Sequence, residues 1–391
     1  MISISRLLCD SIGPGDSLRY LDRKSGPARQ GQVPRPIVVW NCTRQCNLRC
    51  IHCYSSSDWG RSPDELSTQE GKSLLDGLAG FGVPVVLFSG GEPLLRPDVL
   101  ELAAYAKSLG VRPVLSTNGT LISEDVADGI RQVGFGEVGI SLDGLGEQND
   151  RFRGRKGAFE AALQGIRNCL GTGQRVSLRL TMTRGNCDQI PAIFDLVEGE
   201  GIHRVCFYHL AYTGRASSLR QQDLSPDETR RVVDEICWHT MDMHRRGLDK
   251  EVLTVDNHAD GVYLYLKAKA DDPRRASAIL DLLESNGGNN SGIRIGAVDD
   301  VGDVHPDQFW WHYSLGNVRR RSFGDIWSDE TEPLMRSLRD RKGLLKGRCA
   351  WCSYLSLCNG NLRVRAESAY GDVWAEDPAC YLTDEEISVA G

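Results

Sequence analysis

The sequence predicts an α/β fold in the form of a partial (β/α)6 TIM-like barrel, followed by a smaller domain. Six short apolar runs alternate with stretches of helical periodicity between residues 37 and 209. Short links between such runs favour a parallel sheet with right-handed crossovers. Six repeats are too few for the usual closed eight-stranded barrel. We therefore expect an open barrel with its site at the carboxyl ends of the strands.

The barrel is expected to cover residues 37–220. Ser67 followed by Glu70 has the pattern of a capping box, and Gly110 is typical of a helix C-terminus. Residues 1–36, rich in Gly, Pro and Arg, are expected to form an N-terminal extension on the surface. We predict barrel strands at residues 37–40, 83–89, 112–116, 137–142, 175–182 and 204–209, and helices at 67–81, 98–109, 123–133, 158–170 and 188–200.

The alternation stops after the sixth strand. Ser225 and Pro226 suit the start of a long helix. Residues 221–290 predict a mainly helical connecting region, with helices at 225–246, 262–270 and 274–283. We place a smaller C-terminal domain at residues 291–391, with short strands, a helix near 333–341 and a cysteine-rich tail.

The overall composition limits the kinds of partner. Of 391 residues, 40% are hydrophobic and 25% are charged, which is ordinary for a globular protein. The net charge of −7 argues against a nucleic-acid partner, which usually meets a basic face. The N-terminus lacks a signal-peptide pattern and no apolar run is long enough to cross a membrane, so we expect a cytoplasmic protein without a membrane partner. Thirteen cysteines, several of them clustered, point to metal or redox sites rather than disulfides.

The first cysteine cluster follows the first predicted strand. Cys46, Cys50 and Cys53 have the spacing C-x3-C-x2-C. A short loop of this kind can wrap three thiolates around one [4Fe–4S] cubane and leave the fourth iron without a protein ligand. An open position is what a catalytic metal site needs. The alternative is a structural zinc loop with Cys42 as a fourth ligand, although Cys42 also suits a small buried apolar position.

The cysteine loop and the segments after later strands resemble the radical S-adenosylmethionine (SAM) family. Ser-Gly-Gly-Glu-Pro, Ser-Thr-Asn-Gly and Ser-Leu-Asp-Gly segments follow the second, third and fourth strands. The resemblance implies a cluster, held by Cys46, Cys50 and Cys53 as catalytic ligands, that splits SAM into methionine and a 5′-deoxyadenosyl radical. It assigns the SAM contacts to Tyr54, Gly90, Gly91, Glu92, Pro93, Ser116, Asn118, Ser141, Asp143 and Arg153.

Individual roles at the SAM site come from the same resemblance. Glu92 would accept a hydrogen bond from the SAM amino group, and Arg153 would pair with the SAM carboxylate. Ser141 and Asp143 would approach the ribose and methionine ends. His52, inside the cysteine loop, is expected to pack near the adenine rather than to bind metal.

The second cysteine cluster lies in the tail. Cys349, Cys352, Cys358 and Cys380 have the spacing C-x2-C-x5-C-x21-C, and four thiolates could fully ligate a second [4Fe–4S] cluster. A zinc site is the alternative. The pattern resembles the SPASM/twitch extension of radical SAM enzymes, which implies one auxiliary cluster that carries electrons. The turn at Asn359 departs from the Cys-Gly-Gly that is more usual there.

A narrower resemblance points to the branch of the family that modifies tetrapyrroles, and most closely to its members in haem d1 biosynthesis. It rests on residues 36–41, 257–264, 288–292, 304–319 and 374–382. It implies action on propionate side chains of the iron tetrapyrrole 12,18-didecarboxysirohaem, with electrons from an external reductase of flavodoxin or ferredoxin type. Related branch members decarboxylate propionates or remove acetates in an alternative route to haem. A peptide-modifying SPASM enzyme is the other alternative, weakened because only 36 residues precede the first strand.

Substrate contacts are expected around the aromatic segment 309–313. Arg294 and Arg319 flank this segment and could pair with propionates. Trp310 could stack on the macrocycle, and His305 could ligate the substrate iron or act as an acid. The alternatives are domain packing for Trp310 and an ordinary core or surface position for His305.

Overall fold

The computed structural model describes residues 1–20 and 34–388, and it confirms the α/β class. Its strands form one sheet in the order β1-β8-β7-β6-β5-β4-β3-β2-β9-β10-β11. Neighbouring strands from β8 through β9 in this order are parallel. They are β2 (Ile37–Thr43), β3 (Val85–Gly90), β4 (Arg112–Thr117), β5 (Val138–Ser141), β6 (Val176–Thr181), β7 (Arg204–Tyr208), β8 (Glu251–Val255) and β9 (Ile295–Val298).

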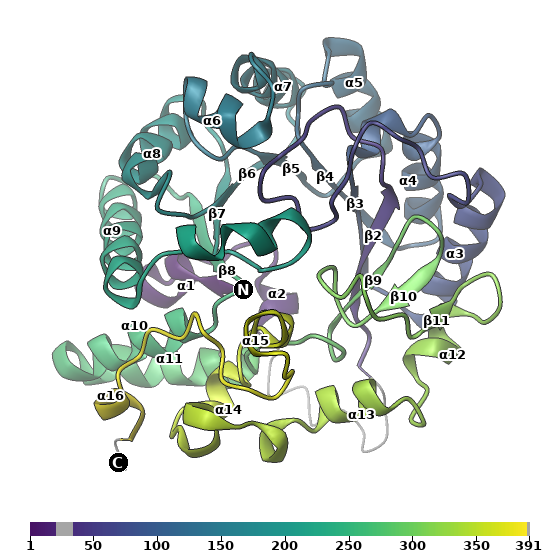
Figure 1. The fold of residues 1–391 in the computed structure, drawn as a ribbon. Helices are drawn as coiled ribbons and strands as arrows, with labels where there is room; N and C mark the ends of the chain where they lie inside the picture. The colour runs from purple at the N-terminus through teal and green to yellow at the C-terminus, as the bar shows by residue number, and fades with distance from the viewer. Residues whose placement is uncertain (21–33, 389–391) are drawn as a thin grey trace.

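Helices form the outer layer of the barrel and the strands form its inner wall (Figure 1). Ser67 and Ser225 cap two of these helices with complete capping boxes, because each accepts from the backbone of a glutamate that bonds back to it. The barrel helices are α3 (Thr68–Phe81), α4 (Val99–Ser108), α5 (Glu124–Val133), α6 (Gly146–Arg153), α7 (Ala158–Gly171), α8 (Ile190–Gly199) and α9 (Pro226–Arg245).

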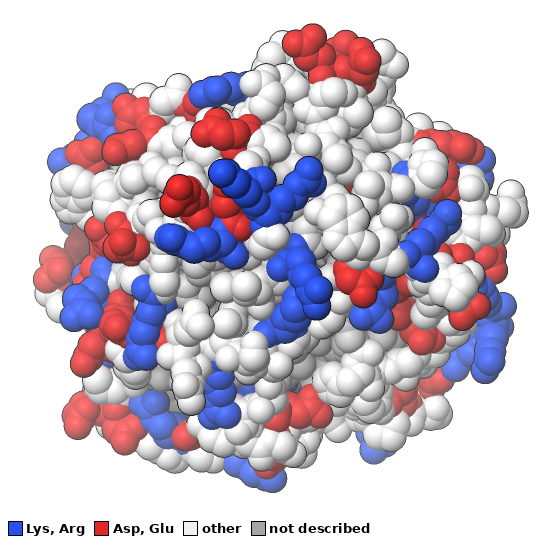
Figure 2. All heavy atoms as spheres, turned by 45° about the horizontal axis from the view of Figure 1, so that its top comes forward, with Lys and Arg blue, Asp and Glu red and all other residues white. Residues whose placement is uncertain are grey.

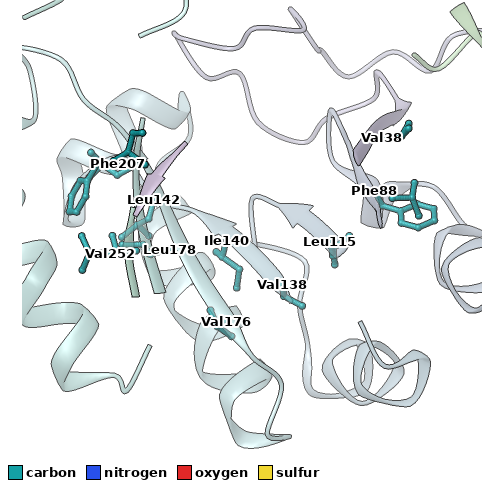
Figure 3. Close-up of a cluster of buried hydrophobic side chains, with 14 of the residues drawn as sticks. Val38, Phe88, Leu115, Val138, Ile140, Leu142, Val176, Leu178, Phe207 and Val252 are labelled. Atoms are coloured by element: carbon teal, nitrogen blue, oxygen red, sulfur yellow. The ribbon is translucent and has the colours of Figure 1, made fainter. Parts of the chain in front are cut away.

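The hydrophobic core lies between the strands and these helices. Side chains on a strand alternate between its two faces, so one set packs under the helices and the other lines the barrel interior. Phe88, Leu115 and Leu178 belong to the first set and are fully buried. Figure 3 shows these side chains with Ile140 and Phe207, which extend the same layer from strand to strand. The inner set is left to form the functional lumen.

The expectation that the N-terminus is a surface extension is wrong for residues 1–20. Ile2, Ile4 and Leu7 are at most 1% exposed. Strand β1 (Ile2–Ser3) pairs antiparallel with β8, and helix α1 (Ile4–Cys9) packs against α9 and β8. These apolar residues cover an edge of the sheet, which was not predicted from the sequence. The short helix α2 (Asp16–Arg19) follows, and residues 21–33 lie outside the described residues.

Two strands join the parallel sheet beyond the six that were predicted. Strand β8 lies in the stretch predicted as mainly helical, ahead of α10 (Ala259–Asp271) and α11 (Pro273–Asn286). Strand β9, from the C-terminal region, pairs parallel with β2 and continues into β10 (Asp303–His305) and β11 (Gly316–Asn317). The barrel and the C-terminal region therefore share one sheet.

Short helices make up the rest of the C-terminal region. They are α12 (Phe323–Trp327), α13 (Pro333–Arg339), α14 (Leu355–Cys358), α15 (Arg363–Tyr370) and α16 (Asp384–Ser388). Among the described residues, no helix combines the length and apolar character that crossing a membrane requires. On the face drawn in Figure 2, Lys and Arg lie interspersed with Asp and Glu.

Candidate active site

The loop with the first three cysteines lies directly after β2, at the carboxyl end of the barrel. Backbone hydrogen bonds from Arg49 and Ile51 to the carbonyls of Arg153 and Phe152, at 3.1 and 3.0 Å, fix the loop against the end of α6. The three cysteines line one cavity of about 210 Å³ together with the ends of several strands. The fold therefore brings Cys46, Cys50 and Cys53 to the place expected for them.

The residues around these thiols would stabilise thiolates once a metal replaces the thiol proton. Burial raises the pKa of the Cys46 thiol to about 12 and also raises that of Cys50, so free thiols here stay protonated. The Nη1 atom of Arg153 lies 3.6 Å from the Cys50 sulfur, and the side-chain nitrogen of Asn118 lies 4.0 Å from that of Cys46. A cation and an amide donor beside the sulfurs suit an iron–sulfur cluster, whose potential depends on such contacts.

The same donor set bears on the zinc alternative. Within residues 1–20 and 34–388, no three or more His, Cys, Asp or Glu side chains converge on a point that could hold a single metal ion. In a cubane each thiolate binds a different iron, so a cluster does not require such convergence. Cys42 points elsewhere: it is fully buried and donates to the Ser89 carbonyl at 3.4 Å. Cys42 therefore packs as a small apolar residue, which was one of the two predictions for it.

Gly90 and Gly91 let the end of β3 touch the cysteine loop. Gly90 has a positive φ of 130°, and a β-carbon on it would lie 2.3 Å from the Thr43 carbonyl oxygen. A β-carbon on Gly91 would lie 2.2 Å from the Gln45 carbonyl oxygen. Any side chain at either position would push the loop away. Both glycines also line the cavity.

Glu92 and Pro93 are not among the residues that line this cavity, and their expected contacts with SAM stay predictions. Glu92 is fully buried, and its carboxylate accepts from the Thr117 hydroxyl and the Asn118 backbone, both at 2.7 Å, and from the Leu94 backbone at 3.1 Å. Its oxygens are thus used to join the end of β3 to the end of β4. An ionised carboxylate has about four acceptor sites, so these three donors leave about one for the amino group of a ligand.

Asp143 bonds to neighbouring residues and is not among those that line the cavity, so its expected approach to SAM also stays a prediction. Its carboxylate lies 2.6 Å from Arg153 and 3.1 Å from His52, and it accepts from the Thr181 backbone at 2.8 Å. Burial alone would raise the pKa of Asp143, but Arg153 and His52 outweigh burial and lower it to about 2. Asp143 therefore stays ionised and orients Arg153, which does line the cavity.

The remaining predicted SAM contacts reach the cavity. Tyr54 donates to the Asn41 side chain at 2.9 Å, lies 3.2 Å from the Ser89 hydroxyl, and packs edge to face on Phe309. The members of the predicted set that line the cavity are Tyr54, Gly90, Gly91, Ser116, Asn118, Ser141 and Arg153, together with the three cysteines.

The second set of cysteines also comes together. Cys349, Cys352, Cys358 and Cys380 line one cavity of about 110 Å³ in the C-terminal region. Burial raises the pKa of the Cys358 thiol, and the other three cysteines of the same cavity raise it further. Four thiols at one cavity suit a fully ligated cluster.

The asparagines after Cys358 explain why this turn departs from Cys-Gly-Gly. Asn359 and Asn361 have positive φ angles of 53° and 57°, a conformation that asparagine tolerates better than most residues. Their side chains also bond to neighbouring loops: Asn359 donates to the Asn289 carbonyl at 2.9 Å, and Asn361 donates to the Asn257 side chain at 2.6 Å. The substitution therefore adds contacts between the tail and the barrel.

Another cavity, of about 370 Å³, lies toward the amino ends of the strands. We call it the lower cavity and the cavity lined by the first three cysteines the upper cavity. The two cavities adjoin, because both are lined by residues that include Leu87, Arg179, Tyr208, Asp256 and Phe309. Apart from Phe309, which lies in the predicted aromatic segment 309–313, sequence reasoning missed these residues. The available signal was Arg179, a charged residue flanked by Leu178 and Leu180 in strand β6.

Of the four predicted substrate residues, the structure places only Arg294 at a cavity. Trp310 is 1% exposed and packs within an apolar cluster. His305 is buried, with one ring nitrogen 2.8 Å from the Tyr313 carbonyl and the other 3.4 Å from Asp299. Arg319 bonds to Glu70 at 2.6 Å on the surface. Trp310 and His305 thus fit the packing and core alternatives, whereas Arg319 is engaged by Glu70.

Comparison with known proteins agrees with this arrangement. A model of the Radical SAM superfamily matches residues 40–197. Fe-coproporphyrin III synthase of Methanosarcina barkeri is 54% identical over 99% of both chains, and pre-heme d1 synthase of Dinoroseobacter shibae is 43% identical over 95% of this chain and 93% of the relative. The crystal structure of Streptococcus suis SuiB bound to S-adenosylmethionine superposes with a TM-score of 0.71 at 18% identity, over 90% of this chain and 78% of SuiB, which is a likeness of fold. This chain belongs to the radical SAM superfamily and shares the fold of members with a SPASM-type C-terminal domain.

Proposed function

We propose that this enzyme removes side chains from the iron tetrapyrrole 12,18-didecarboxysirohaem and forms Fe-coproporphyrin III. One observation carries the choice of product: the chain is 54% identical over its whole length to a protein named Fe-coproporphyrin III synthase, against 43% for a pre-heme d1 synthase. This favours acetate removal in the alternative route to haem over the propionate removal of haem d1 biosynthesis. Both reactions begin from the same substrate in the family that the sequence resembles.

The first cysteine set supports the radical part of the proposal. A [4Fe–4S] cluster bound with SAM supplies a 5′-deoxyadenosyl radical after one-electron reduction. Cys46, Cys50 and Cys53 would hold that cluster, and Arg153, oriented by Asp143 at 2.6 Å, would pair with the SAM carboxylate. Gly90 and Gly91 keep the strand end close to the loop.

The second cysteine set would hold an auxiliary [4Fe–4S] cluster. Cys349, Cys352, Cys358 and Cys380 together supply four thiolates, one for each iron of a cubane. Such a cluster exposes no iron to substrate, so we assign it electron transfer. An external reductant of flavodoxin or ferredoxin type would deliver electrons to the protein.

A second candidate is the haem d1 reaction itself. The 43% identity to pre-heme d1 synthase over 95% of this chain supports it. The peptide-modifying alternative has weaker support, because the likeness to SuiB, at 18% identity, concerns the fold alone.

The test begins with anaerobic reconstitution of the full chain. About eight irons per chain are expected if both sites hold cubanes. SAM and a reductant should then release 5′-deoxyadenosine. Mass spectrometry after incubation with 12,18-didecarboxysirohaem should show loss of two acetate side chains. Loss of propionates instead would favour the haem d1 candidate, and an unchanged tetrapyrrole despite SAM cleavage would contradict the substrate.

A further inference from the structure

Arg179 is a buried cation that has almost no partners in the protein. It lies on β6, and its Nη1 atom donates to the Ser116 hydroxyl at 2.7 Å. Its Nε atom is buried and has no hydrogen-bond partner. Arg179 forms no ion pair with any residue in the described parts of the chain. Burial of an arginine in this state costs free energy unless something else supplies the missing acceptors.

Other buried arginines of this protein have more partners, although the Nε atoms of Arg153 and Arg363 are also buried without a hydrogen bond. Arg153 pairs with Asp143 at 2.6 Å, and Arg365 pairs with Asp377 at 2.8 Å. Arg341 and Arg363 have no carboxylate partner, but each makes three hydrogen bonds to oxygen atoms. Arg179, with one hydrogen bond, therefore stands apart from the arginines that hold the fold together.

The position of Arg179 gives a reason for this difference. It lines both the upper cavity with the three cysteines and the lower cavity. Its guanidinium lies across β5 where Gly139 has no side chain, since a β-carbon there would be 2.2 Å from the Arg179 Nε atom. The fold thus leaves room for this side chain at the junction of the two cavities, within reach of anything that extends from one into the other.

Two more arginines line the lower cavity without a counter-ion. Arg294 is half-buried, Arg112 is exposed, and neither makes a side-chain hydrogen bond or ion pair to a described residue. Burial lowers the pKa of Arg294, as expected for a cation without a carboxylate nearby. Between these cations the wall is apolar, with Val85, Leu87 and Val114 among its residues. Apolar walls with a few cations suit a flat ring that carries several carboxylates.

Three acidic residues line the lower cavity, Glu137, Asp256 and Asp307, and none of them forms an ion pair with Arg112, Arg179 or Arg294 among the described residues. Glu137 is already paired with Arg175 and Arg204. Asp307 accepts from the Phe309 backbone at 2.8 Å and is bonded to Ser291. The unpaired cations therefore remain open to an anionic ligand.

We propose that Arg179, Arg112 and Arg294 bind carboxylate side chains of the substrate, with Arg179 holding the one next to the SAM cavity. The inference rests on the proposed function, because it takes the substrate to be a tetrapyrrole with several carboxylates. Arg179 is a substrate-binding residue in this assignment, and Arg112 and Arg294 fix the far side of the ring. Guanidinium groups suit the role because they bind carboxylates through two parallel hydrogen bonds.

The test compares two porphyrins on the full chain, reconstituted and loaded with SAM. Iron coproporphyrin III carries four carboxylates, and its tetramethyl ester has the same ring without charge. Absorbance titrations should show Arg179→Gln weakening the binding of the acid about 10- to 100-fold while the affinity for the ester changes less than about twofold. Arg294→Gln should weaken binding of the acid about 3- to 10-fold. Arg167→Gln, at a surface arginine paired with Glu200, is the matched control and should change neither affinity.

Several outcomes would overturn the inference. One is wild-type protein that binds the acid and the ester equally well, and this holds even if the Arg179 variant fails to fold. Another is an Arg179→Gln protein that loses SAM affinity but keeps its affinity for the acid, which would assign the cation to SAM. Wild-type protein that binds neither porphyrin would instead contradict the proposed function, so the two failures are distinguishable.

Discussion

Two buried arginines of the barrel interior, Arg153 and Arg179, differ in how the protein meets their charge. At the carboxyl end, Arg153 is held by Asp143, and the carboxylate of Glu92 accepts three hydrogen bonds from neighbouring residues. Deeper in the lumen, Arg179 has one hydrogen bond. Paired groups fix the shape of the protein, whereas an unpaired buried cation keeps its bonding capacity for a ligand. The contrast separates residues that hold the site in shape from residues that are available to bind a ligand.

The largest expected effect is at the cysteine loop. Replacing Cys46, Cys50 and Cys53 together by serine should lower release of 5′-deoxyadenosine by at least about 1000-fold, because the cofactor carries the chemistry. Iron content should fall by about half if one of two cubanes is lost. The control is Cys42→Ser, which should keep its iron. Normal turnover in the triple variant, or zinc at the loop of an oxygen-free preparation, would contradict the cluster assignment.

The next effect tests whether Asp143 acts through Arg153. Asp143→Asn breaks a buried ion pair, which costs about 3–5 kcal/mol when one partner is left behind. We expect SAM to bind about 10- to 100-fold more weakly, measured by equilibrium dialysis. Asp98→Asn breaks the Arg96 pair outside the cavity and serves as the control for stability. Equal losses of SAM affinity in the two variants would show that Asp143 has no special role at the site.

A smaller effect tests the structural role of Glu92. Glu92→Gln places an amide where three protein donors point, so we expect the free energy of unfolding to fall by about 1–3 kcal/mol. SAM affinity, measured on the folded protein, should fall less than about threefold, because Glu92 does not line the cavity. A large loss of SAM affinity at unchanged stability would instead support the expected contact between Glu92 and the SAM amino group.

The smallest effect concerns Asp256, which lines both cavities and has a positive φ of 66°. Burial raises its pKa from 3.8 to about 6. The folded state therefore binds the Asp256 proton more tightly than the unfolded state does. The stability gained from this protonation is complete below pH 3.8 and is lost as the pH rises through about 6. Asp256→Asn, which tolerates the backbone conformation, should stabilise the protein by about 1–3 kcal/mol at pH 8 and by less at pH 5. Urea unfolding at the two pH values measures this, and an equal gain at both would contradict it.

Much of the fold and of the cofactor sites could be predicted from the sequence. The repeated strands and helices from β2 to β7 have strong periodicity, and cysteine spacing identified both clusters of thiols. Strand β8 has five residues inside a stretch of helical sequence, and β1 has only two. Their place in the sheet depends on pairing with distant residues, and no local pattern records this.

The site residues show a different limit. A motif indicates which residues lie near a ligand, but it does not tell which atoms they contact. Glu92 and Asp143 stand at the expected strand ends, yet their carboxylates bond to protein donors. Conversely, Trp310 and His305 attracted attention by their residue type and proved to be buried in packing. Arg179 could have been suspected, since a cation flanked by Leu178 and Leu180 in a barrel strand is unusual.

Strand β9 has a consequence for how this chain could be shortened or recombined. Because β9 pairs with Ile37–Trp40 of β2, the region that carries the second cysteine set is hydrogen-bonded to the strand that leads into the first cysteine set. A truncation ahead of residue 295 would strip the partner from that strand and leave a bare hydrogen-bonding edge beside the cysteine loop, inviting aggregation. The tail therefore cannot be exchanged as a detachable module, and chimaeras within this family should keep β2 and β9 from the same parent.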